Sequence, residues 1–534
     1  MRSFIRNADE VVLPTGYVCR NAELEIIALT PAISQLFGFD TGSIGAITVM
    51  PSFERSFGGK PLDELLRGVV VASILIPSGL TGIVAGNCSD MISRKWTISL
   101  GSAIFAIGSV VSAASDSHLG ILIAGRCIAG AGEGLFLGCL GVYICEISPK
   151  HLRASMMMIQ MLVNTGAVAV AFFFCYASVR IPGSLSWRAP FILQAVTATG
   201  VAILAPLQPY SPRYLLSKNR RAEAERVLDL LVGKEDTDER KELLMTGVAG
   251  RKMSQLEAMR DIWSKGVRGR TILGTALNVF QQLSGIDFVL FFAPLLFAQA
   301  GLDPTTSSFV ASGVTGILLF VSIIASSFFI NKVGRRTIWL IGGSATAFCH
   351  LVLGTLYATS AARTPVGKYV VLVFIELFAI SFTCSWASVT KLYAAEIQPS
   401  RTRAAAASFG QAMNQLFNFG VAVSGPAFLA SSSYGPYFAY GGFTLCGCAF
   451  GYFFMPEVMG KSLESIDTTF EGSPVVATWP KVFRSARLTE ARQRRTSRSQ
   501  SNVVPGETRA ETIRALQQEG VEMSTIREEA VVDD

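Results

Sequence analysis

One stretch of the sequence places polar side chains inside an apolar run that is long enough to cross a bilayer. It reads Gln281-Gln282-Leu283-Ser284-Gly285-Ile286-Asp287 and continues with mostly apolar residues to Pro294. Polar groups at membrane depth cost several kcal/mol unless they are paired, so they often mark a pathway or a ligand site. A single glutamine is as readily explained by a contact between helices, but two amides and a carboxylate together favour a ligand site.

The composition is typical of a protein that crosses a membrane many times. Of the 534 residues, 50% are hydrophobic and 16% are charged, and the mean hydropathy is +0.43. Most of the 10 cysteines lie inside apolar runs, so no disulfide framework is expected. No cleavable signal peptide is visible before the first apolar run near Leu24. The net charge of +7 is expected to reflect basic residues left in the cytoplasm and requires no nucleic-acid partner.

Hydropathy predicts an all-α membrane protein with twelve transmembrane helices. The predicted spans are 22–49, 64–86, 97–115, 119–144, 154–178, 187–208, 269–298, 307–330, 337–360, 367–393, 404–431 and 437–455. They form two six-helix pseudo-symmetric bundles, 22–208 and 269–455, joined by a charged cytoplasmic linker with helical periodicity at 209–268. Residues 1–21 form a cytoplasmic N-terminus and 456–534 a largely disordered cytoplasmic tail, because the basic segments gather on the side of both termini.

Two motifs occur once in each predicted bundle. The pattern E-I-x-P-x-x-x-R spans Glu146 to Arg153 and recurs from Glu396 to Arg403, and the loop Asp90-Met-Ile-Ser-Arg-Lys recurs as Asn331-Lys-Val-Gly-Arg-Arg. Two unrelated motifs that return at nearly the same distance indicate a duplicated six-span unit. Two such units with a site between them are the architecture of an alternating-access transporter.

Five motifs in order resemble those of one known family. They are Phe37-Gly38-Phe39-Asp40-Thr41-Gly42, Gly125-Arg126 with Gly130-Ala131-Gly132, Pro209-Tyr210-Ser211-Pro212-Arg213-Tyr214-Leu215, Gln281-Gln282-Leu283-Ser284-Gly285-Ile286, and Pro456-Glu457 with Gly460-Lys461-Ser462-Leu463-Glu464. Together they resemble the sugar porter family of the major facilitator superfamily, especially its fungal members, from about Phe37 to Glu464. The resemblance implies a transporter, not an enzyme, with no cofactor or metal and with H+ as the coupling ion.

Asp40 lies well inside the first predicted span. Arg126, inside the fourth, is its natural partner, because an unpaired buried arginine is as costly as an unpaired buried carboxylate. Protonation of Asp40 weakens such a pair and lets the helices shift, which makes a proton-coupled switch. In the family that the chain resembles, the matching Asp and Arg play this role in proton symporters, whereas facilitators tend to carry Asn at the first position. A purely structural ion pair is the alternative.

Amide side chains suit sugar recognition, because each offers both a donor and an acceptor to a hydroxyl group. By resemblance, Gln160, Gln281, Gln282 and Asn414 fall on sugar-contacting positions. Asn418 lies one helical turn from Asn414 on the same face. For Gln160 and Asn418 alone, a contact between helices is an equal alternative.

The departures from the family pattern change the expected pocket. Asp287 replaces the usual Asn, Phe291-Phe292 replaces a Tyr-Tyr pair, Gln415 replaces a common Trp, and Ala387-Ser388-Val389-Thr390-Lys391 replaces G-P-x-x-W. We expect Asp287 and Lys391 to face the cavity and pair there. Their charges would then cancel, and the substrate would be a neutral polyhydroxy compound. Lys391 could instead hold an anion such as a sugar acid or a quinate-like compound, or it could snorkel to the cytoplasmic interface.

Charged residues on the cytoplasmic face are expected to form a gate. Pairing between the two bundles would lock the outward-facing state, and breaking the pairs would be part of opening inward, as the family implies. The expected gate residues are Asp90, Arg94, Glu146, Arg153, Arg335, Arg336, Glu396 and Arg403. The usual D-R-x-G-R-R loop has Met91 for Arg and Ser93 for Gly in the first copy and Asn331 for Asp in the second, which predicts a weaker lock.

The sequence thus predicts a secondary transporter that moves a monosaccharide or related polyhydroxy compound by alternating access, with proton symport. A transporter of a sugar acid or quinate-like anion, a facilitative uniporter and a non-transporting sugar sensor are the alternatives. The expected partners are the substrate, a proton and the lipid bilayer, and the expected state is a monomer in the plasma membrane.

Overall fold

The computed structural model describes most of the chain up to Met459. The described residues are 5–7, 10–12, 18–58, 62–116, 118–148, 153–231, 255–301, 306–330, 332–399, 401–459 and 470. The tail predicted for 456–534 therefore lies almost wholly outside them.

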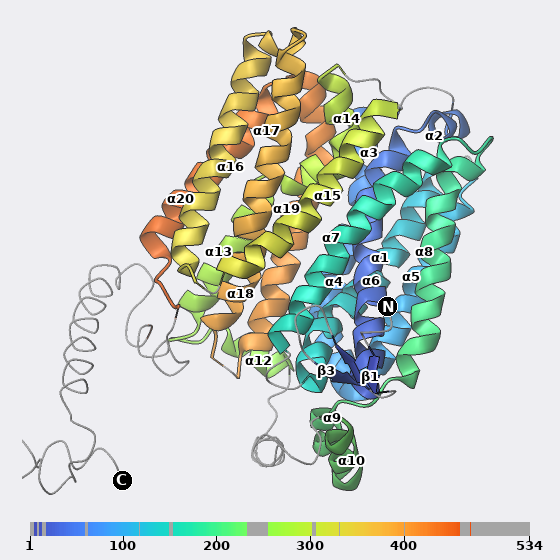
Figure 1. Cartoon of the computed structure of the whole chain (residues 1–534), viewed down its shortest axis with the longest axis vertical. Coiled ribbons are helices and arrows are strands. Elements are labelled where there is room, and N and C mark those ends of the chain that lie inside the picture. Colours follow the sequence, from blue (N-terminus) through green and yellow to red (C-terminus); the bar gives the residue numbers. More distant parts are fainter. Residues whose placement is uncertain are drawn as a thin grey trace, which may run out of the picture. The chain divides into compact units, whose positions relative to one another are not determined.

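Helices form at all six predicted spans of the first bundle (Figure 1). They are α1 (Asn21–Thr48), α3 (Glu64–Ala72) followed by α4 (Leu75–Ile92), α5 (Arg94–Ala113), α6 (Leu119–Ile147), α7 (Arg153–Ser178) and α8 (Leu185–Leu204). Between α1 and α3 lies α2 (Pro51–Ser56), and a 3-10 turn η1 (Ala205–Leu207) follows α8. Three short strands, β1 (Ile5–Asn7), β2 (Glu10–Val12) and β3 (Val18–Arg20), pair antiparallel in that order ahead of α1.

The last six predicted spans also form helices. They are α13 (Arg268–Leu283) followed by α14 (Ile286–Gln299), α15 (Thr306–Phe329), α16 (Arg335–Ala358), α17 (Gly367–Phe382) continuing through η3 (Thr383–Ala387) into α18 (Ser388–Glu396), α19 (Arg403–Ser431) and α20 (Gly435–Phe454). A 3-10 turn η2 (Ala361–Arg363) precedes α17. The described part of the linker forms α9 (Pro212–Ser217), α10 (Arg221–Leu231) and α12 (Gln255–Asp261).

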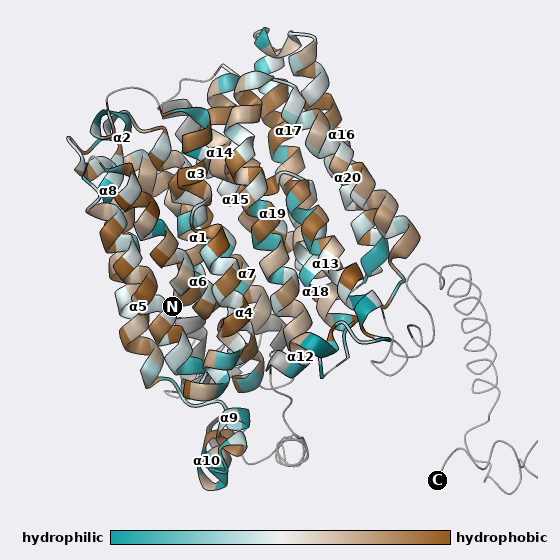
Figure 2. Cartoon of the chain, turned by 180° about the vertical axis from the view of Figure 1, so that it is seen from behind, coloured by the Kyte–Doolittle hydropathy of each residue, from teal (hydrophilic) through white to brown (hydrophobic). Residues whose placement is uncertain are grey.

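The hydropathy of the helices agrees with a membrane-spanning arrangement. Nine helical stretches in the described residues are long and apolar enough to cross a bilayer; α1, α19 and α20 fall outside this set, although they occupy predicted spans. Figure 2 shows hydrophobic residues along the long helices and hydrophilic ones gathered on α9, α10 and α12. We call the end of the helices that carries Arg94 and Arg335 the inner end, and the opposite end the outer end.

The seventh and tenth spans depart from regular α-helix. Gly285 has φ +78° and separates α13 from α14, and Phe292 has non-helical angles (φ −112°, ψ 20°) shortly before Pro294. In the tenth span η3 is a π-helical turn. Broken helices are tolerated at membrane depth where protein or a water-filled cavity surrounds the freed backbone groups. The breaks at Gly285 and Phe292 lie in the stretch from Gln281 to Pro294, which carries polar side chains inside an apolar run.

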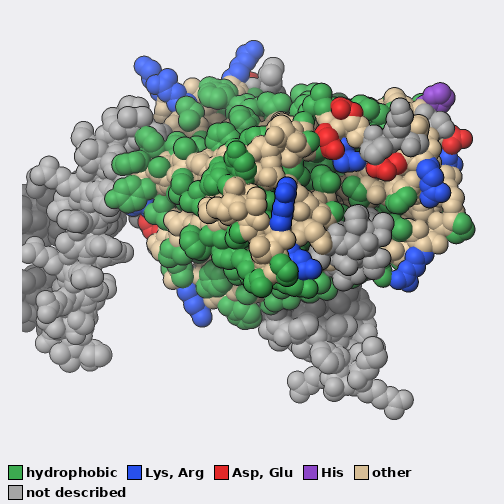
Figure 3. All heavy atoms as spheres, turned by 90° about the horizontal axis from the view of Figure 1, so that it is seen from above, with side chains coloured by type: hydrophobic (Ala, Val, Ile, Leu, Met, Phe, Trp, Pro, Cys, Tyr) green, Lys and Arg blue, Asp and Glu red, His purple; other side chains and the backbone are tan. Residues whose placement is uncertain are grey.

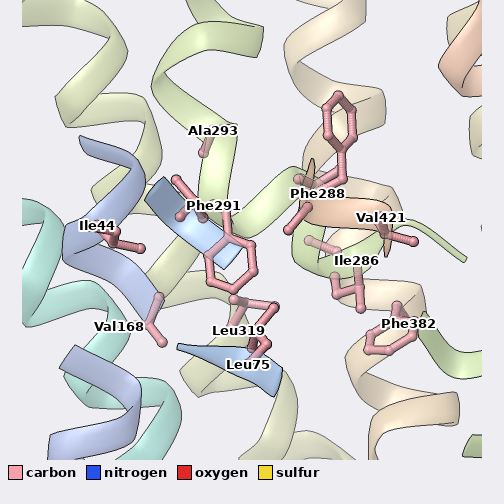
Figure 4. Close-up of a cluster of buried hydrophobic side chains, with 14 of the residues drawn as sticks. Ile44, Leu75, Val168, Ile286, Phe288, Phe291, Ala293, Leu319, Phe382 and Val421 are labelled. Carbon is pink, nitrogen blue, oxygen red and sulfur yellow. The ribbon is translucent and has the colours of Figure 1, made fainter. Parts of the chain in front are cut away.

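Apolar side chains from both sets of six helices meet near the outer end. Figure 4 shows Phe291 of α14 among Ile44, Val168 and Leu319, which come from α1, α7 and α15. All four belong to one buried cluster that continues through both sets of helices. Burying apolar side chains of this size stabilises the contact by about 1.5–3 kcal/mol each when water would otherwise reach them.

Small residues let helices of the two sets approach closely in their outer halves. A β-carbon on Gly45 of α1 would lie 1.3 Å from the carbonyl oxygen of Phe291, and one on Gly68 of α3 would lie 2.4 Å from that of Val423 in α19. A β-carbon on Gly316 of α15 would lie 2.5 Å from the Cα of Ala169 in α7. Figure 3, a view from above, shows hydrophobic and other uncharged atoms filling most of this face. The described helices are therefore closed together at their outer end.

Candidate substrate and proton sites

Asp40 and Arg126 form a buried, two-pronged ion pair. Arg126 Nη1 donates to Asp40 Oδ1 at 3.1 Å and Nη2 donates to Oδ2 at 3.2 Å, and the residues are 1% and 4% exposed respectively. Arg126 Nη2 also donates to the carbonyl oxygen of Val71 at 3.1 Å. The contact expected from the two apolar spans is thus present, and it joins α1, α3 and α6. Removing one partner of such a pair leaves an uncompensated buried charge at a cost of about 3–5 kcal/mol.

Gln194 of α8 completes the surroundings of Asp40. Its Nε2 donates to Asp40 Oδ1 and to Ser43 Oγ, each at 3.2 Å. Gln194 is 2% exposed. An amide donor of this kind holds the carboxylate in place without adding a charge.

An array of amides joins α13 to α19. Gln282 Nε2 donates to Asn414 Oδ1 at 2.9 Å, and Asn414 Nδ2 donates to the carbonyl oxygen of Asn278 at 3.0 Å and to Gln281 Oε1 at 3.4 Å. Gln281, Gln282 and Asn414 are all buried. Three residues expected to contact a sugar are therefore in mutual contact. Gln281 and Gln282 lie in the last turn of α13, before the break at Gly285, and Asn414 reaches them from α19.

Several buried amide oxygens, in this array and on α7, accept no hydrogen bond in the described residues. They are Gln282 Oε1, Asn418 Oδ1, Gln160 Oε1 and Asn164 Oδ1. An unsatisfied buried acceptor costs about 1–3 kcal/mol, and a ligand hydroxyl that donates to it removes that cost. These acceptors come from α7, α13 and α19, which belong to different sets of helices. Their chemistry fits a ligand with several hydroxyl groups.

Asp287 and Lys391 interact, but they do not form a close ion pair. Asn418 Nδ2 donates to Asp287 Oδ2 at 2.5 Å. The Lys391 ammonium group attracts the Asp287 carboxylate electrostatically, but no ion pair within 4.0 Å joins these two described residues. Lys391 is exposed and Asp287 is half-buried. The structure thus directs Lys391 toward Asp287, and its ammonium group retains hydrogen-bonding capacity for a ligand or water.

The other departures from the family pattern are Phe291-Phe292, Gln415 and the segment from Ala387, which directly follows Trp386. Phe291 and Phe292 are buried at 4% and 1% exposure and lie in the apolar cluster. Trp386 is fully buried and stacks on Trp339 at 4.0 Å between ring centroids, so its ring packs between α16 and η3. Gln415 is 3% exposed, and its Nε2 donates across to Ser78 Oγ of α4 at 3.4 Å. This last hydrogen bond joins the two sets of helices.

The inner charged residues of the first set pair with one another. Arg94 Nη1 contacts Asp90 Oδ1 at 2.8 Å, and Arg94 Nε contacts Glu146 Oε2 at 2.9 Å. Ser211 Oγ, at the N-cap of α9, donates to Glu146 Oε2 at 2.5 Å. The side chain of Arg153 lies outside the described residues.

The second set repeats this arrangement. Arg335 Nη2 contacts Glu396 Oε1 at 3.3 Å, and Arg403 Nη2 donates to the carbonyl oxygen of Gln398 at 3.1 Å. Arg336 Nη2 donates to the carbonyl oxygen of Tyr452 at 2.7 Å. Within the part of the chain that the structure describes, no ion pair joins residues 22–208 to residues 269–455. The pairing expected between the bundles also involves Arg153, whose side chain the structure does not describe, so that pairing stays a prediction.

Glu457 gives the Pro456-Glu457 motif a structural role. Its Oε1 accepts from the backbone N–H of Arg335 at 2.9 Å and its Oε2 from that of Arg336 at 3.0 Å. A carboxylate at a helix N-terminus is stabilised by the free N–H groups and the helix dipole. In the matching motif of the first set, Tyr210 stands in place of Glu, and the Lys95 ammonium group lies 3.8 Å from the centre of its ring.

The sequence analysis does not single out four buried polar residues that the structure brings into these sites. They are Ser78, Glu133, Gln194 and His350. Glu133 had a signal, since it is a carboxylate inside the apolar span 119–144. His350 Nε2 donates to the carbonyl oxygen of Ser284 at 2.9 Å and so supports the break between α13 and α14. That hydrogen bond joins α16 to the C-terminal end of α13, and periodicity does not reveal which helices meet.

Twelve helices at the predicted spans, around a buried ion pair and an amide array, fit a membrane transporter. Residues 27–470 match the Sugar (and other) transporter family, and the chain belongs to that family. It is therefore a transporter and not an enzyme, and its fold is the twelve-helix fold of the major facilitator superfamily, as the sequence predicted.

Relatives and solved structures agree with this assignment. A sugar transport protein of Oryza sativa subsp. japonica is 26% identical over 83% of this chain and 88% of its own length. A probable quinate permease of Aspergillus fumigatus is 26% identical over 86% of this chain and 90% of its own length. The structure is also similar to that of the proton:xylose symporter of E. coli bound to 6-bromo-6-deoxy-D-glucose, with a TM-score of 0.71, 25% identity, and coverage of 84% of this chain and 99% of that one.

Proposed function

We propose that the protein moves a monosaccharide or a related polyhydroxy compound together with a proton. The observation that carries this proposal is the buried pair of Asp40 and Arg126, held by two hydrogen bonds of 3.1 and 3.2 Å. A proton that binds Asp40 removes its charge and weakens both hydrogen bonds. Because the pair joins α1 to α6, its weakening lets these helices move relative to each other.

The amide array supports a polyhydroxy substrate. Gln281, Gln282, Asn414 and Asn418 present both donors and acceptors, and Gln282 and Asn418 each retain an acceptor oxygen without a partner in the described residues. A sugar offers several hydroxyl groups at spacings that such amides can match. The xylose symporter with a bound sugar derivative is a structural relative with the same fold, which is consistent with a sugar-sized ligand.

The charge balance next to the array favours a neutral substrate. Asp287 and Lys391 carry opposite charges and attract each other, so the wall that they form is neutral overall. A charged substrate would add an unbalanced charge to a site of low dielectric constant, at a cost of several kcal/mol.

A sugar acid or quinate-like anion is the second candidate, and a specific observation favours it. The Lys391 ammonium group makes no ion pair within 4.0 Å in the described residues and is exposed. An anion that displaced it from Asp287 would gain a direct charge-assisted contact. The probable quinate permease among the relatives belongs to the same family.

The structure fits the inward-facing stage of an alternating-access cycle. The outer halves are in close contact at Gly45, Gly68 and Gly316, and the described inner charges pair within each set of helices. Pairing of the inner charges between sets would characterise the outward-facing stage. We further propose a monomer in the plasma membrane with both termini in the cytoplasm, which needs no cofactor or metal, and whose coupling ion is H+.

Uptake measurements in transporter-deficient cells test the proposal. Labelled glucose, xylose, galacturonate and quinate are supplied one at a time while the external pH is recorded. We expect one neutral sugar to be taken up with alkalinisation of the medium, and both signals to be lost in Asp40→Asn. Uptake of an acid alone, lost in Lys391→Met, would assign the second candidate. Uptake without proton movement would make the protein a uniporter, and no uptake by protein at the cell surface would support a sensor.

A further inference from the structure

A second carboxylate lies buried beside the Asp40–Arg126 pair. Glu133 is on α6, seven residues and about two helical turns after Arg126, and it is 1% exposed. Ser78 Oγ of α4 donates to Glu133 Oε1 at 2.9 Å. No cation lies within ion-pair distance of Glu133 in the described residues, although Arg126 and Asp40 both act on it electrostatically.

The local charge count is unbalanced when every group is ionised. Arg126 carries one positive charge, and both of its terminal nitrogens donate to Asp40. Asp40 and Glu133 then carry two negative charges against one cation. Two carboxylates that share one buried cation do not both ionise at low cost. One proton restores neutrality, and the tight contact of Asp40 with Arg126 leaves Glu133 as the group that takes it.

Other charged groups are too far along their helices to neutralise Glu133. The elements packed against α6 are α4 and α5, which approach it closely at Ser78 to Gly82 and at Gly101 to Phe105, together with α1, α3 and α7. In α3 the buried Arg67 pairs with Glu54 and Glu64. In α4 the only charged residue is Asp90, which pairs with Arg94. In α5 the only charged residues are Arg94 and Lys95, and Lys95 Nζ donates to the carbonyl oxygens of Pro206 and Gln208 at 2.8 Å each.

A short hydrogen-bond chain connects Glu133 to the amide array. Gln415 Nε2 of α19 donates to Ser78 Oγ at 3.4 Å, and Ser78 Oγ donates to Glu133 Oε1 at 2.9 Å. Gln415 directly follows Asn414, which accepts from Gln282. The chain therefore runs from the proton-coupling pair in the first set of helices to the expected substrate residues in the second.

We infer that Glu133 is a second proton-binding residue, and that the Ser78–Gln415 hydrogen bond carries its protonation state to the substrate site. Its carboxylate takes one proton from water to become a carboxylic acid, with no other bond made or broken. An ionised Glu133 is the stronger acceptor, so it holds Ser78 more firmly and orients the Ser78 oxygen toward Gln415. Protonation weakens this link between the two sets of helices. The transport role of Glu133 rests on the proposed proton symport, whereas its protonation does not.

Infrared spectroscopy of the full chain in lipid vesicles tests the protonation directly, without a substrate. Spectra at neutral pH in H2O and D2O are compared for the unchanged protein and for Glu133→Gln, which keeps the side-chain shape. We expect the unchanged protein to show a carbonyl band of a protonated carboxylic acid that shifts in D2O and that is lost in Glu133→Gln. Identical carboxylic-acid bands in the two proteins would overturn the inference.

Matched variants assign the band and test the chain. Glu376→Gln removes another membrane-embedded carboxyl, which accepts from Thr315 Oγ1 at 2.7 Å on the far set of helices, and it should leave the Glu133 band in place. Ser78→Ala retains Glu133 but removes its donor, so the band should move to higher frequency. An unchanged frequency in Ser78→Ala would overturn the hydrogen-bond chain, even if Glu133→Gln fails to fold.

Uptake of D-xylose at several external pH values tests the coupling. We expect uptake by the unchanged protein to fall at alkaline pH, where Glu133 loses its proton, and we expect Glu133→Gln to lack this fall. Ser78→Ala should lower uptake about threefold, as the loss of one hydrogen bond implies. If uptake by Glu133→Gln follows external pH as in the unchanged protein, the coupling role is wrong. If the unchanged protein does not move D-xylose, the choice of substrate fails, while the infrared comparison still decides whether Glu133 binds a proton.

Discussion

The backbone of Phe291 lies directly against Gly45, with its carbonyl oxygen 1.3 Å from the position that a β-carbon of Gly45 would occupy. The contact joins α1 to the first turns of α14, just after the break at Gly285. It is therefore a point where closure of the outer end depends on the absence of a side chain.

Gly45→Ala should prevent full closure of the outer end. The added methyl group collides with backbone, which cannot move aside as a flexible side chain would. Uptake should fall by at least tenfold, and a thiol reagent supplied from outside should reach a cysteine placed at Phe291 more readily. Gly200→Ala on α8 is the matched control, because a β-carbon there meets nothing within 4 Å. Equal uptake by the two variants would show that the approach at Gly45 is not needed for transport.

Ser93→Gly should stabilise the protein. Ser93 has φ 96° and ψ 160°, a region that is essentially restricted to glycine, and it occupies the position at which the related loop motif carries Gly. Relief of such strain is worth about 1–3 kcal/mol, partly offset by the greater freedom of Gly in the unfolded chain. The thermal unfolding midpoint in detergent should rise. Ser148→Gly, at an ordinary φ of −85°, should lower it, and a fall in both variants would refute the strain.

The sequence predicts contacts that charge compensation requires, but it does not predict contacts that depend on how the helices pack. Asp40 and Arg126 could be paired in advance, because a charge inside an apolar span has few ways to be compensated. Lys391 is ambiguous from the sequence, since a lysine near the end of a span can reach water or a partner, and only the packing of α18 against α13 brings it within electrostatic reach of Asp287. The helices themselves followed from hydropathy and length.

Two features depended on information that one sequence does not carry. The chain Glu133–Ser78–Gln415 needs the relative rotation of α4, α6 and α19, which hydropathy leaves free. The ion pairs of Arg94 with Glu146 and of Arg335 with Glu396 likewise need the placement of the helices in space, which hydropathy leaves open.

The pair of Asp287 and Lys391 should show strong coupling in a double-mutant cycle. Lys391→Met leaves Asp287 without its opposing charge, so uptake of a neutral sugar should fall by more than tenfold. Lys391→Met combined with Asp287→Asn removes both charges and should restore part of the uptake. If the substrate is an anion, the double variant should stay as inactive as Lys391→Met. Additive effects of the two changes would mean that the two charges do not act on each other.

Glu457→Gln should loosen the inner end of α16. The change removes a negative charge that accepts from the backbone N–H groups of Arg335 and Arg336. The expected loss is about 1 kcal/mol, seen as a lower unfolding midpoint in detergent. Glu223→Gln removes an exposed pair with Arg220 and should change the midpoint little. A midpoint unaffected by Glu457→Gln would leave the Pro456-Glu457 motif without this role.

The most direct test of proton symport is a simultaneous record of substrate uptake and proton movement in vesicles that contain only this protein. The vesicles hold a pH-sensitive dye, and glucose, xylose, galacturonate and quinate are added in turn without a membrane potential. The account predicts that one neutral sugar enters and acidifies the vesicle interior, and that Asp40→Asn abolishes the acidification. Entry of the sugar with no change in internal pH in the unchanged protein would contradict it, and would make the Asp40–Arg126 pair a structural contact.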